Sequence, residues 1–159
     1  MKGPKPRPAA ERFWARVDKS GACWVWTGPT TKKGYGTFLG PNGKTANCHK
    51  FSYEVAHGLV PEGLHVDHIC HNRACVNPAH LRAVTPKQNQ ENRGGLNANN
   101  KSGASGVRRT SNGRWKAEIT SNGKNVYIGI YDTRQAAAEA AQAKRIELFT
   151  HNDRDRIAA

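Results

Sequence analysis

The sequence predicts an α+β protein of two small domains, and three observations lead to this prediction. The first half of the 159-residue chain alternates short β-prone runs with helical periodicity. The second half holds three strand-like runs, separated by two Ser-Asn-Gly turns, and then an alanine-rich helical pattern. A polar segment, residues 93–105, reads as a linker between them. We therefore expect one domain over residues 1–92, and over residues 106–159 a three-stranded antiparallel sheet packed on one helix.

The charge of the chain favours a nucleic acid as its partner. Lysine and arginine outnumber aspartate and glutamate by 25 to 12, which gives a formal net charge of +13. Residues 1–95 carry 14 basic and 6 acidic side chains, and residues 96–159 carry 11 and 6. A polyanion gains affinity for such a surface by releasing its condensed counterions. A generally basic surface, as in many ribosome-associated proteins, is the alternative that charge alone leaves open.

Composition also bears on the compartment. Four cysteines are too few and too unevenly placed for a secreted disulfide scaffold. No apolar run approaches the roughly 20 residues of a membrane span, and the N-terminus lacks the apolar core of a signal peptide. We expect a cytoplasmic protein that does not enter a membrane. Residues 1–10, rich in lysine and proline, are expected to form a flexible basic arm.

Local patterns predict the elements of the first half. The apolar spacing within 49–57, closed by Gly58, predicts a helix, although the alternation of Phe51, Tyr53 and Val55 would also fit a strand. The other expected elements are a helix over 9–17, a β-prone run at 23–26, a hairpin from 34 with its turn at 41–43, a strand over 64–68 and a helix from Pro86 capped by Thr85.

Soft ligands at close spacing predict a structural zinc site. Cys70, Cys75 and His80 follow a C-x4-C-x4-H pattern, and thiolate and imidazole ligands suit tetrahedral zinc. The fourth ligand is expected to be Cys23, which precedes an apolar strand, while Cys48 opens an apolar-faced helix and is expected to be buried. His71, next to Cys70, is a rival ligand whose spacing fits less well.

A second set of possible metal ligands, close to the first in sequence, includes hard oxygen donors. Asp67, His68 and Asn89 offer oxygens and an imidazole base, which are the groups needed to hydrolyse a phosphodiester with magnesium. The expected order of strand, zinc-held loop and helix places His68 at a strand end. The helix that carries Asn89 should pack back against that strand and bring the two residues together.

The segment His68-x-Cys70-x4-Cys75-x-Asn77-Pro78-x-His80-Leu81, followed by Asn89, resembles the HNH endonucleases of the ββα-metal, or His-Me finger, superfamily. More narrowly, it resembles the His-Cys box homing endonucleases and phage HNH enzymes. The resemblance implies that His68 is the general base, that Asn89 and Asp67 hold Mg²⁺, and that Asn77 pins the loop by hydrogen bonds. It also implies that Zn²⁺ is held by Cys23, Cys70, Cys75 and His80. Arg73 and Lys87 are candidates for an electrostatic helper by proximity alone.

The second half contains the clearest hairpin signals in the chain. Three strands are expected over 107–109, 114–120 and 125–131, with an Asn-Gly turn in each connection. Asp132, with Gln135 three residues later, is expected to cap a helix that runs to about Phe149. One face of this helix holds the small or apolar side chains of Ala137, Ala140, Ala141 and Leu148, so the helix should approach the sheet closely.

Gly106-Val107-Arg108, Trp115-x-Ala117-Glu118-Ile119, Tyr127 to Thr133 and the alanine-rich helix resemble the ethylene-response-factor, or APETALA-type, DNA-binding domain. In that family the sheet reads the major groove of double-stranded DNA. The resemblance therefore places on DNA the side chains of Arg108, Arg114, Trp115, Lys116 and Tyr127. A core position is the alternative for the aromatic residues, and for Trp115 above all.

Together these patterns predict a zinc-stapled ββα-metal nuclease domain, followed by the small sheet-and-helix DNA reader. The expected activity is metal-dependent hydrolysis of DNA phosphodiester bonds by a homing or phage-encoded endonuclease in a bacterial or phage-infected cell. A non-catalytic, zinc-containing DNA-binding regulator is the alternative. The sequence leaves open whether the protein acts as a monomer or as a homodimer.

Overall fold

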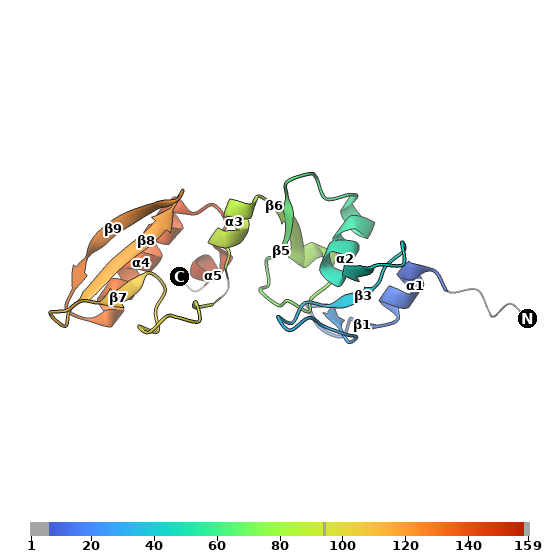
Figure 1. Cartoon of the computed structure of the whole chain (residues 1–159), viewed down its shortest axis with the longest axis horizontal. Helices are drawn as coiled ribbons and strands as arrows, with labels where there is room; N and C mark the ends of the chain where they lie inside the picture. The colour runs from blue at the N-terminus through green and yellow to red at the C-terminus, as the bar shows by residue number, and fades with distance from the viewer. Residues whose placement is uncertain (1–6, 94, 158–159) are drawn as a thin grey trace, which may run out of the picture. The chain divides into compact units, whose positions relative to one another are not determined.

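The computed structural model describes residues 7–93 and 95–157, and it confirms the α+β class (Figure 1). The chain divides into two compact units, Met1–Thr85 and Pro86–Ala159. The boundary thus lies before the helix that begins at Pro86, which the sequence analysis placed in the first domain. Of the expected basic arm, residues 1–6 lie outside the described residues. Among the helices of the described part, none is long and apolar enough to cross a membrane.

Short elements make up the first unit. In chain order they are α1 (Ala9–Trp14), β1 (Val17–Asp18), β2 (Val25–Trp26), β3 (Thr37–Leu39), β4 (Thr45–Asn47), α2 (Cys48–His57), β5 (His65–His68), the 3₁₀-helix η1 (Pro78–His80) and β6 (Leu81–Val84). The expected hairpin is present as the antiparallel pair β3 and β4. The helix expected at 49–57 is present as α2, and it ends at Gly58, whose φ of 86° is a conformation that glycine adopts readily.

An aromatic cluster forms the core of the first unit. Phe13 is fully buried and stacks on Trp26, with ring centroids 5.3 Å apart and an interplanar angle of 19°. Phe38 and Phe51 contact the Phe13 ring from β3 and α2. Gly36 lies so close that a Cβ there would approach the Trp26 ring to 2.7 Å, so this position requires glycine. The helices and the hairpin are therefore held around one group of rings.

The strand β6 was not predicted, because only a zinc-held loop was expected between the strand at 64–68 and the helix from Pro86. Instead, Pro78 begins η1, whose N-cap Asn77 accepts a hydrogen bond from the Ala79 amide. The turn of η1 sends the chain back along β5. Strands β5 and β6 then pair antiparallel, with Asp67 opposite Arg82 and His68 opposite Leu81.

The second unit contains longer elements: α3 (Pro86–Glu91), β7 (Val107–Arg109), β8 (Trp115–Ser121), β9 (Lys124–Tyr131), α4 (Arg134–Leu148) and α5 (Asp153–Ile157). The three strands form an antiparallel sheet in the order β7-β8-β9, as predicted. Asn122 and Gly123 both have positive φ angles, as a two-residue hairpin turn requires. The helix α5 was not predicted.

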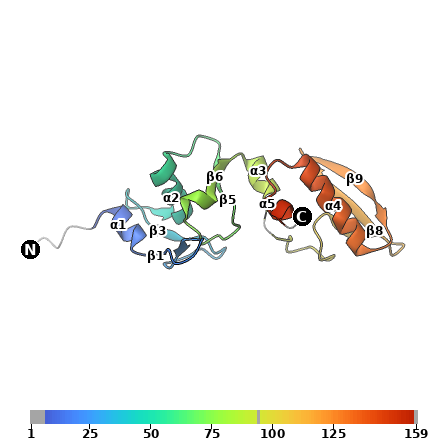
Figure 2. The ribbon, with the colours of Figure 1, turned by 180° about the vertical axis from the view of Figure 1, so that it is seen from behind.

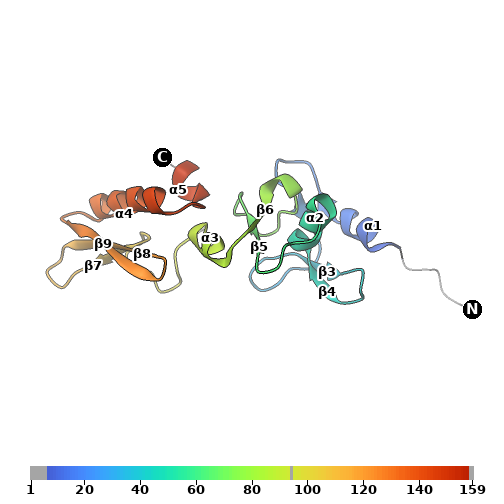
Figure 3. The ribbon, with the colours of Figure 1, turned by 90° about the horizontal axis from the view of Figure 1, so that it is seen from above.

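The helix α4 covers one face of this sheet, and Figures 2 and 3 show the helix and the strands as two layers. Ala137 and Ala141 are fully buried against Ala117 of β8, so the small side chains allow the close approach that the sequence predicted. The N-cap of α4 is Thr133, whose hydroxyl accepts from the Ala136 amide. The prediction of Asp132 as the cap was wrong, because the Asp132 carboxylate pairs with Arg114 instead.

The segment predicted as a flexible linker makes ordered contacts within the second unit. The carbonyl oxygens of Ser102 and Ser105 accept hydrogen bonds from Arg134 and Arg145 of α4, at 3.2 and 2.9 Å. Asn100 donates to the carbonyl of Ala104 at 2.8 Å. The expectation of a free linker rested on the lack of apolar residues, but long arginine side chains from elsewhere in the unit bind its backbone.

Candidate active site and nucleic-acid interface

Four soft ligands converge in the first unit. The ligand atoms of Cys23, Cys70, Cys75 and His80 all lie within 4.8 Å of one another. Tetrahedral zinc, with Zn–S near 2.3 Å and Zn–N near 2.0 Å, requires sulfur and nitrogen to be about 3.5 Å apart. Both Cys23 and Cys75 place Sγ 3.6 Å from Nδ1 of His80. The donor set and its spacing therefore fit a zinc ion.

The structure decides between the two candidates for the fourth ligand. Cys23 lies in the cluster, because the chain around Trp24 and Val25 runs beside Cys75. Cys48 is fully buried in the aromatic core, where burial raises the pKa of its thiol to about 12. His71 is not among the clustered ligands of the described residues.

Burial also affects the thiols of the cluster. Removal from water raises the pKa of the Cys70 thiol, and it raises the pKa of the Cys75 thiol to about 12. The thiolates that zinc needs are therefore stable only with a cation among them. The loop is held further by Asn77, whose side chain donates to the carbonyl oxygen of Ala22 at 2.9 Å and accepts from Ala79.

His68, the predicted base, is held by the same loop. It lies at the end of β5 and is only 6% exposed. Its Nε2 lies 3.1 Å from the carbonyl oxygen of Cys75. A carbonyl oxygen can only accept, so Nε2 carries the proton and the lone pair of the neutral ring is on Nδ1. Cys75 thus contributes its sulfur to the cluster of possible zinc ligands and its carbonyl oxygen to the orientation of His68.

The rings around His68 were not predicted from the sequence. His49, from the first turn of α2, places its ring centroid 4.9 Å from that of His68, and Tyr35 lies 6.0 Å away. The guanidinium of Arg73 lies over the Tyr35 ring at 5.6 Å and donates to the carbonyl of Lys33. No local pattern marked His49 or Tyr35, because segments far apart in sequence bring them to His68. Arg73 was named only by its proximity.

Burial lowers the pKa of His68 from its ordinary value, and the charges of His71 and Arg73 act in the same direction. The hydrogen bond to Cys75 and the carboxylate of Asp67 oppose this shift without cancelling it. Burial likewise lowers the pKa of His49 to about 4, and its Nδ1 is buried with no hydrogen-bond partner in the described part of the chain. Both rings are therefore neutral near pH 7.

Asp67 is buried next to His68, and Arg82 holds its carboxylate. The Oδ2 atom accepts from Nε and Nη2 of Arg82 at 3.3 and 3.1 Å, across the β5–β6 pair. This ion pair was not predicted, because β6 was not. Asn89, the other predicted magnesium ligand, is half-buried in α3 and belongs to the second unit.

In the second unit, the sheet face opposite α4 carries three of the five residues that the sequence placed on DNA. Arg108 of β7 lies directly opposite Lys116 of β8 in the strand register. Tyr127 lies on β9, and its side chain is 58% exposed. The Lys116 ammonium lies 5.3 Å from the centre of the Tyr127 ring. Glu118 ion-pairs with Lys116, and its Oε1 is 4.0 Å from Arg108. The face therefore combines cations with an exposed aromatic ring around one carboxylate.

The other two predicted residues have different positions. Trp115 packs against the core between the sheet and α4, which is the alternative that the sequence left open. Arg114 precedes β8, and its Nε lies 2.7 Å from the carboxylate of Asp132.

Comparison with known proteins finds a family model that matches each of two segments. A family model described as HNH endonuclease matches residues 48–91, and one described as AP2 domain matches residues 102–150. The first match includes His68, three of the four clustered residues and α3. The second covers the sheet and α4. Residues 48–91 are therefore similar to HNH endonucleases and residues 102–150 to AP2 domains, and these similarities support a nuclease or DNA-binding role.

Individual relatives come from viruses. Protein 7.7 of Escherichia phage T7 is 46% identical over 69 residues, which are 43% of this chain and 52% of the relative. Protein 2.8 of the same phage is 43% identical over 75 residues, 46% of this chain and 50% of the relative. An uncharacterized HNH endonuclease of Acanthamoeba polyphaga mimivirus is 33% identical over 102 residues, 64% of this chain and 52% of the relative. The chain thus spans about half the length of these relatives, and no solved structure matches it.

Proposed function

We propose that this chain, with its HNH endonuclease segment and its AP2 domain, is a metal-dependent endonuclease that hydrolyses phosphodiester bonds of double-stranded DNA. The observation that carries the proposal is the setting of His68, which is buried at a strand end, is hydrogen-bonded to Cys75 and lies beside Asp67. A protein that used this segment only as a zinc scaffold would not need a neutral, oriented imidazole next to a carboxylate.

His68 acts as the general base. The proton on Nε2 is held by the Cys75 carbonyl, so Nδ1 takes the proton of the attacking water. The water oxygen forms a bond to phosphorus, and the bond between phosphorus and one sugar oxygen breaks. A lowered pKa keeps the ring unprotonated at neutral pH, which a base requires.

Asp67 and Asn89 hold magnesium in this proposal. When bound, the ion neutralises charge on the phosphate and on the leaving oxygen. Arg82 orients the Asp67 carboxylate through two donors from one guanidinium. Arg73 lies near the base and is the favoured helper for the phosphate charge, since it acts on His68 electrostatically.

Zinc has a structural role in this proposal. The cluster fixes Cys75, whose carbonyl oxygen orients His68. The integrity of the cluster is therefore needed for the geometry of the base, although none of its four ligands takes part in proton transfer.

The exposed face of the sheet is proposed to bind DNA. Arginine pairs well with guanine, lysine with phosphate, and an aromatic ring packs against a sugar or a thymine methyl group. Arg108, Lys116 and Tyr127 offer these groups on one face. Arg114 reaches DNA only after it leaves Asp132, and Trp115 supports the sheet from inside. The relatives from phages favour a phage-encoded, site-directed or homing enzyme that works in the infected cell.

The test is cleavage of a supercoiled plasmid with and without magnesium. The wild-type chain should cut only with the metal, and His68→Ala should cut about 10²–10⁴-fold more slowly while it binds DNA as before. His57→Ala, which removes an exposed imidazole at the end of α2, is the control and should cut normally. DNA binding without cleavage at any magnesium concentration would instead favour a regulator.

A further inference from the structure

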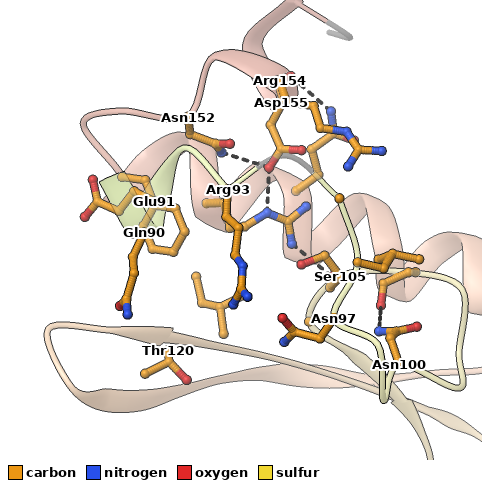
Figure 4. Close-up of a pocket in the computed structure, with 18 of the residues that line it drawn as sticks. Gln90, Glu91, Arg93, Asn97, Asn100, Ser105, Thr120, Asn152, Arg154 and Asp155 are labelled. Atoms are coloured by element: carbon orange, nitrogen blue, oxygen red, sulfur yellow. Dashed lines mark hydrogen bonds and ion pairs between the residues drawn. The ribbon is translucent and has the colours of Figure 1, made fainter. Parts of the chain in front are cut away.

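Polar side chains in the pocket of the second unit have hydrogen-bond partners, as Figure 4 shows. The carboxylate of Asp155 accepts from Nε of Arg145 at 2.5 Å and from the amide of Asn152 at 2.8 Å. Arg145 also donates to the carbonyl oxygen of Ser105 at 2.9 Å. Such pairing is the usual condition of a buried polar atom, because an unmade hydrogen bond away from water costs free energy.

Three buried side-chain atoms of the described residues lack a hydrogen-bond partner, namely Nδ1 of His49, Nε2 of His71 and Oε1 of Glu91. The Glu91 oxygen is compensated, because the ammonium of Lys87 lies 2.9 Å away. The other two atoms are imidazole nitrogens beside His68. The His71 amide donates to the His68 carbonyl oxygen at 3.2 Å, and the ring centroid of His49 is 4.9 Å from that of His68. The unpaired nitrogens therefore lie around the proposed base.

Of the two rings, His49 is the one held among the rings around the base, whereas His71 adjoins the cluster of possible zinc ligands. The centroid of the His49 ring is 5.4 Å from that of Tyr35. The backbone fixes this arrangement, since the amide of Cys48 at the start of α2 donates to the carbonyl oxygen of Gly36 at 2.9 Å. His49 is thus positioned by the packing of two segments, without a hydrogen bond from its own Nδ1.

The buried nitrogen determines which edge of the His49 ring can act. A neutral imidazole has one N–H donor and one lone pair, and burial lowers the pKa of His49 to about 4, so the ring is neutral at pH 7. Nδ1 is buried while the residue as a whole is only half-buried, which leaves the Nε2 edge as the accessible one. The proton therefore belongs on Nε2, where it can meet an acceptor. The lone pair on Nδ1 is out of reach of water, so His49 cannot serve as a second base.

We infer that His49 is a second catalytic residue, whose imidazole donates a hydrogen bond from Nε2 to the phosphate group that the water activated by His68 attacks. This inference rests on the proposed function. His49 forms no covalent bond and transfers no proton in this role. A donor that is already fixed in place stabilises the charge of the reacting phosphate without any reorganisation during the reaction.

This role also explains why an unpaired nitrogen is retained. Replacing an unpaired buried polar group by an apolar one of similar shape normally stabilises a protein. A side chain at position 49 that served only to pack against Tyr35 and His68 would therefore be better as a phenylalanine. Catalysis and stability make opposite demands on this position, as they do in many active sites. The loss of the imidazole should accordingly slow cleavage and stabilise the first unit.

The experiment compares full-length His49→Phe, His49→Gln and His49→Asn, with His57→Phe as the matched control on the same helix. Phenylalanine keeps a flat ring without a donor, glutamine places an amide N–H near the position of Nε2, and asparagine places one near Nδ1. His57 is exposed at the end of α2. The measured quantities are kcat and KM for plasmid cleavage with magnesium, and the thermal midpoint without it. Tryptophan fluorescence reports this midpoint, since three of the four tryptophans belong to the first unit.

We expect His49→Phe to lower kcat by about 10²–10³-fold, the loss expected for one fixed donor, with KM nearly unchanged. Its thermal midpoint should rise by about 4–8 °C, because the cost of an unpaired buried nitrogen is removed from a small domain. His49→Gln should cleave about tenfold faster than His49→Asn, since only glutamine restores a donor near Nε2. His57→Phe should match the wild type in all three quantities.

Two outcomes would overturn the inference. One is normal cleavage by His49→Phe while His68→Ala is strongly impaired, and this result would leave the proposed function intact. The other is slow cleavage together with a lower thermal midpoint, which would make His49 a structural residue. If His49→Phe does not fold, the other two variants decide, because equal rates of His49→Gln and His49→Asn would rule out a donor at Nε2. Normal cleavage by His68→Ala would instead refute the proposed function, whereas the midpoint of His49→Phe would still report on the unpaired nitrogen.

Discussion

The two units each have a small hydrophobic core, and different contacts stabilise them. In the first, strands are two to four residues long, and the structure depends on a core of packed aromatic rings and on a cluster of three cysteines and a histidine. In the second, strands of up to eight residues pack against a fifteen-residue helix through buried alanines. The first unit places its clustered cysteines in and beside loops, and the second presents a regular sheet face.

This difference determines how the stability of each unit should respond to a substitution or to the loss of a ligand. The loop between β5 and β6 is held by hydrogen bonds, by the buried Val76 and by the cluster of three cysteines and a histidine, so the loss of one ligand should disrupt the whole loop. The sheet and helix are held by many similar contacts, so a single change should weaken the unit gradually. The four predictions below test this contrast in order of decreasing effect.

Removal of zinc should unfold the first unit and leave the second intact. Zinc contributes about 10–16 kcal/mol to small structural sites, far more than the apolar contacts of this loop can replace. Cys75→Ser, or a strong chelator, should therefore collapse the amide NMR signals of residues 7–85 while the signals of β7, β8 and β9 stay dispersed. Cys48→Ala removes a thiol outside the cluster and should retain about one zinc per chain. A folded wild-type protein without zinc would refute the assignment.

Overpacking should weaken only the second unit. Ala141 is fully buried between α4 and the sheet, so Ala141→Leu should cost about 1–3 kcal/mol of unfolding free energy. Chemical denaturation followed through the signals of β8 would measure this loss. Ala143→Leu makes the same change on the exposed side of α4 and should be nearly neutral. Equal effects of the two changes would show that α4 does not pack as described.

On the exposed sheet face, Arg108→Ala should cost about 1–3 kcal/mol of DNA-binding free energy if the side chain reads a guanine. Arg114→Ala should cost less, because the Arg114 side chain is already paired with Asp132. Binding to specific and random duplexes at several salt concentrations would separate the two roles. A uniform loss with a shallower salt dependence would indicate that Arg108 contacts phosphate.

Acidification should destabilise the first unit more than the second. Burial lowers the pKa of His68, and it lowers the pKa of His49 from 6.5 to about 4. The unfolded chain therefore binds protons first, and stability is lost as the pH falls from about 6.5 toward 4. Thermal unfolding at pH 7 and pH 5 would measure the effect, and His49→Gln should reduce it. A midpoint that does not depend on pH in this range would contradict the buried, neutral state of His49.

The sequence alone predicted what depends on local spacing. The C-x4-C-x4-H pattern identified three clustered ligands, because a short loop keeps its residues close in any compact conformation. Both Asn-Gly turns, the three strands of the sheet and the start of α3 after Thr85 were also predicted, since each follows from the backbone preferences of a few residues.

Only the tertiary structure decided what depends on residues far apart in the chain. It brought Cys23 rather than Cys48 to the cluster, paired Arg82 with Asp67 through an unpredicted strand, and turned Trp115 toward the core. It also fixed α3 to the second unit through Glu91, although the HNH endonuclease family match extends over that helix. No local preference encodes these contacts, because each needs two segments whose separation is set by the packing of the whole unit.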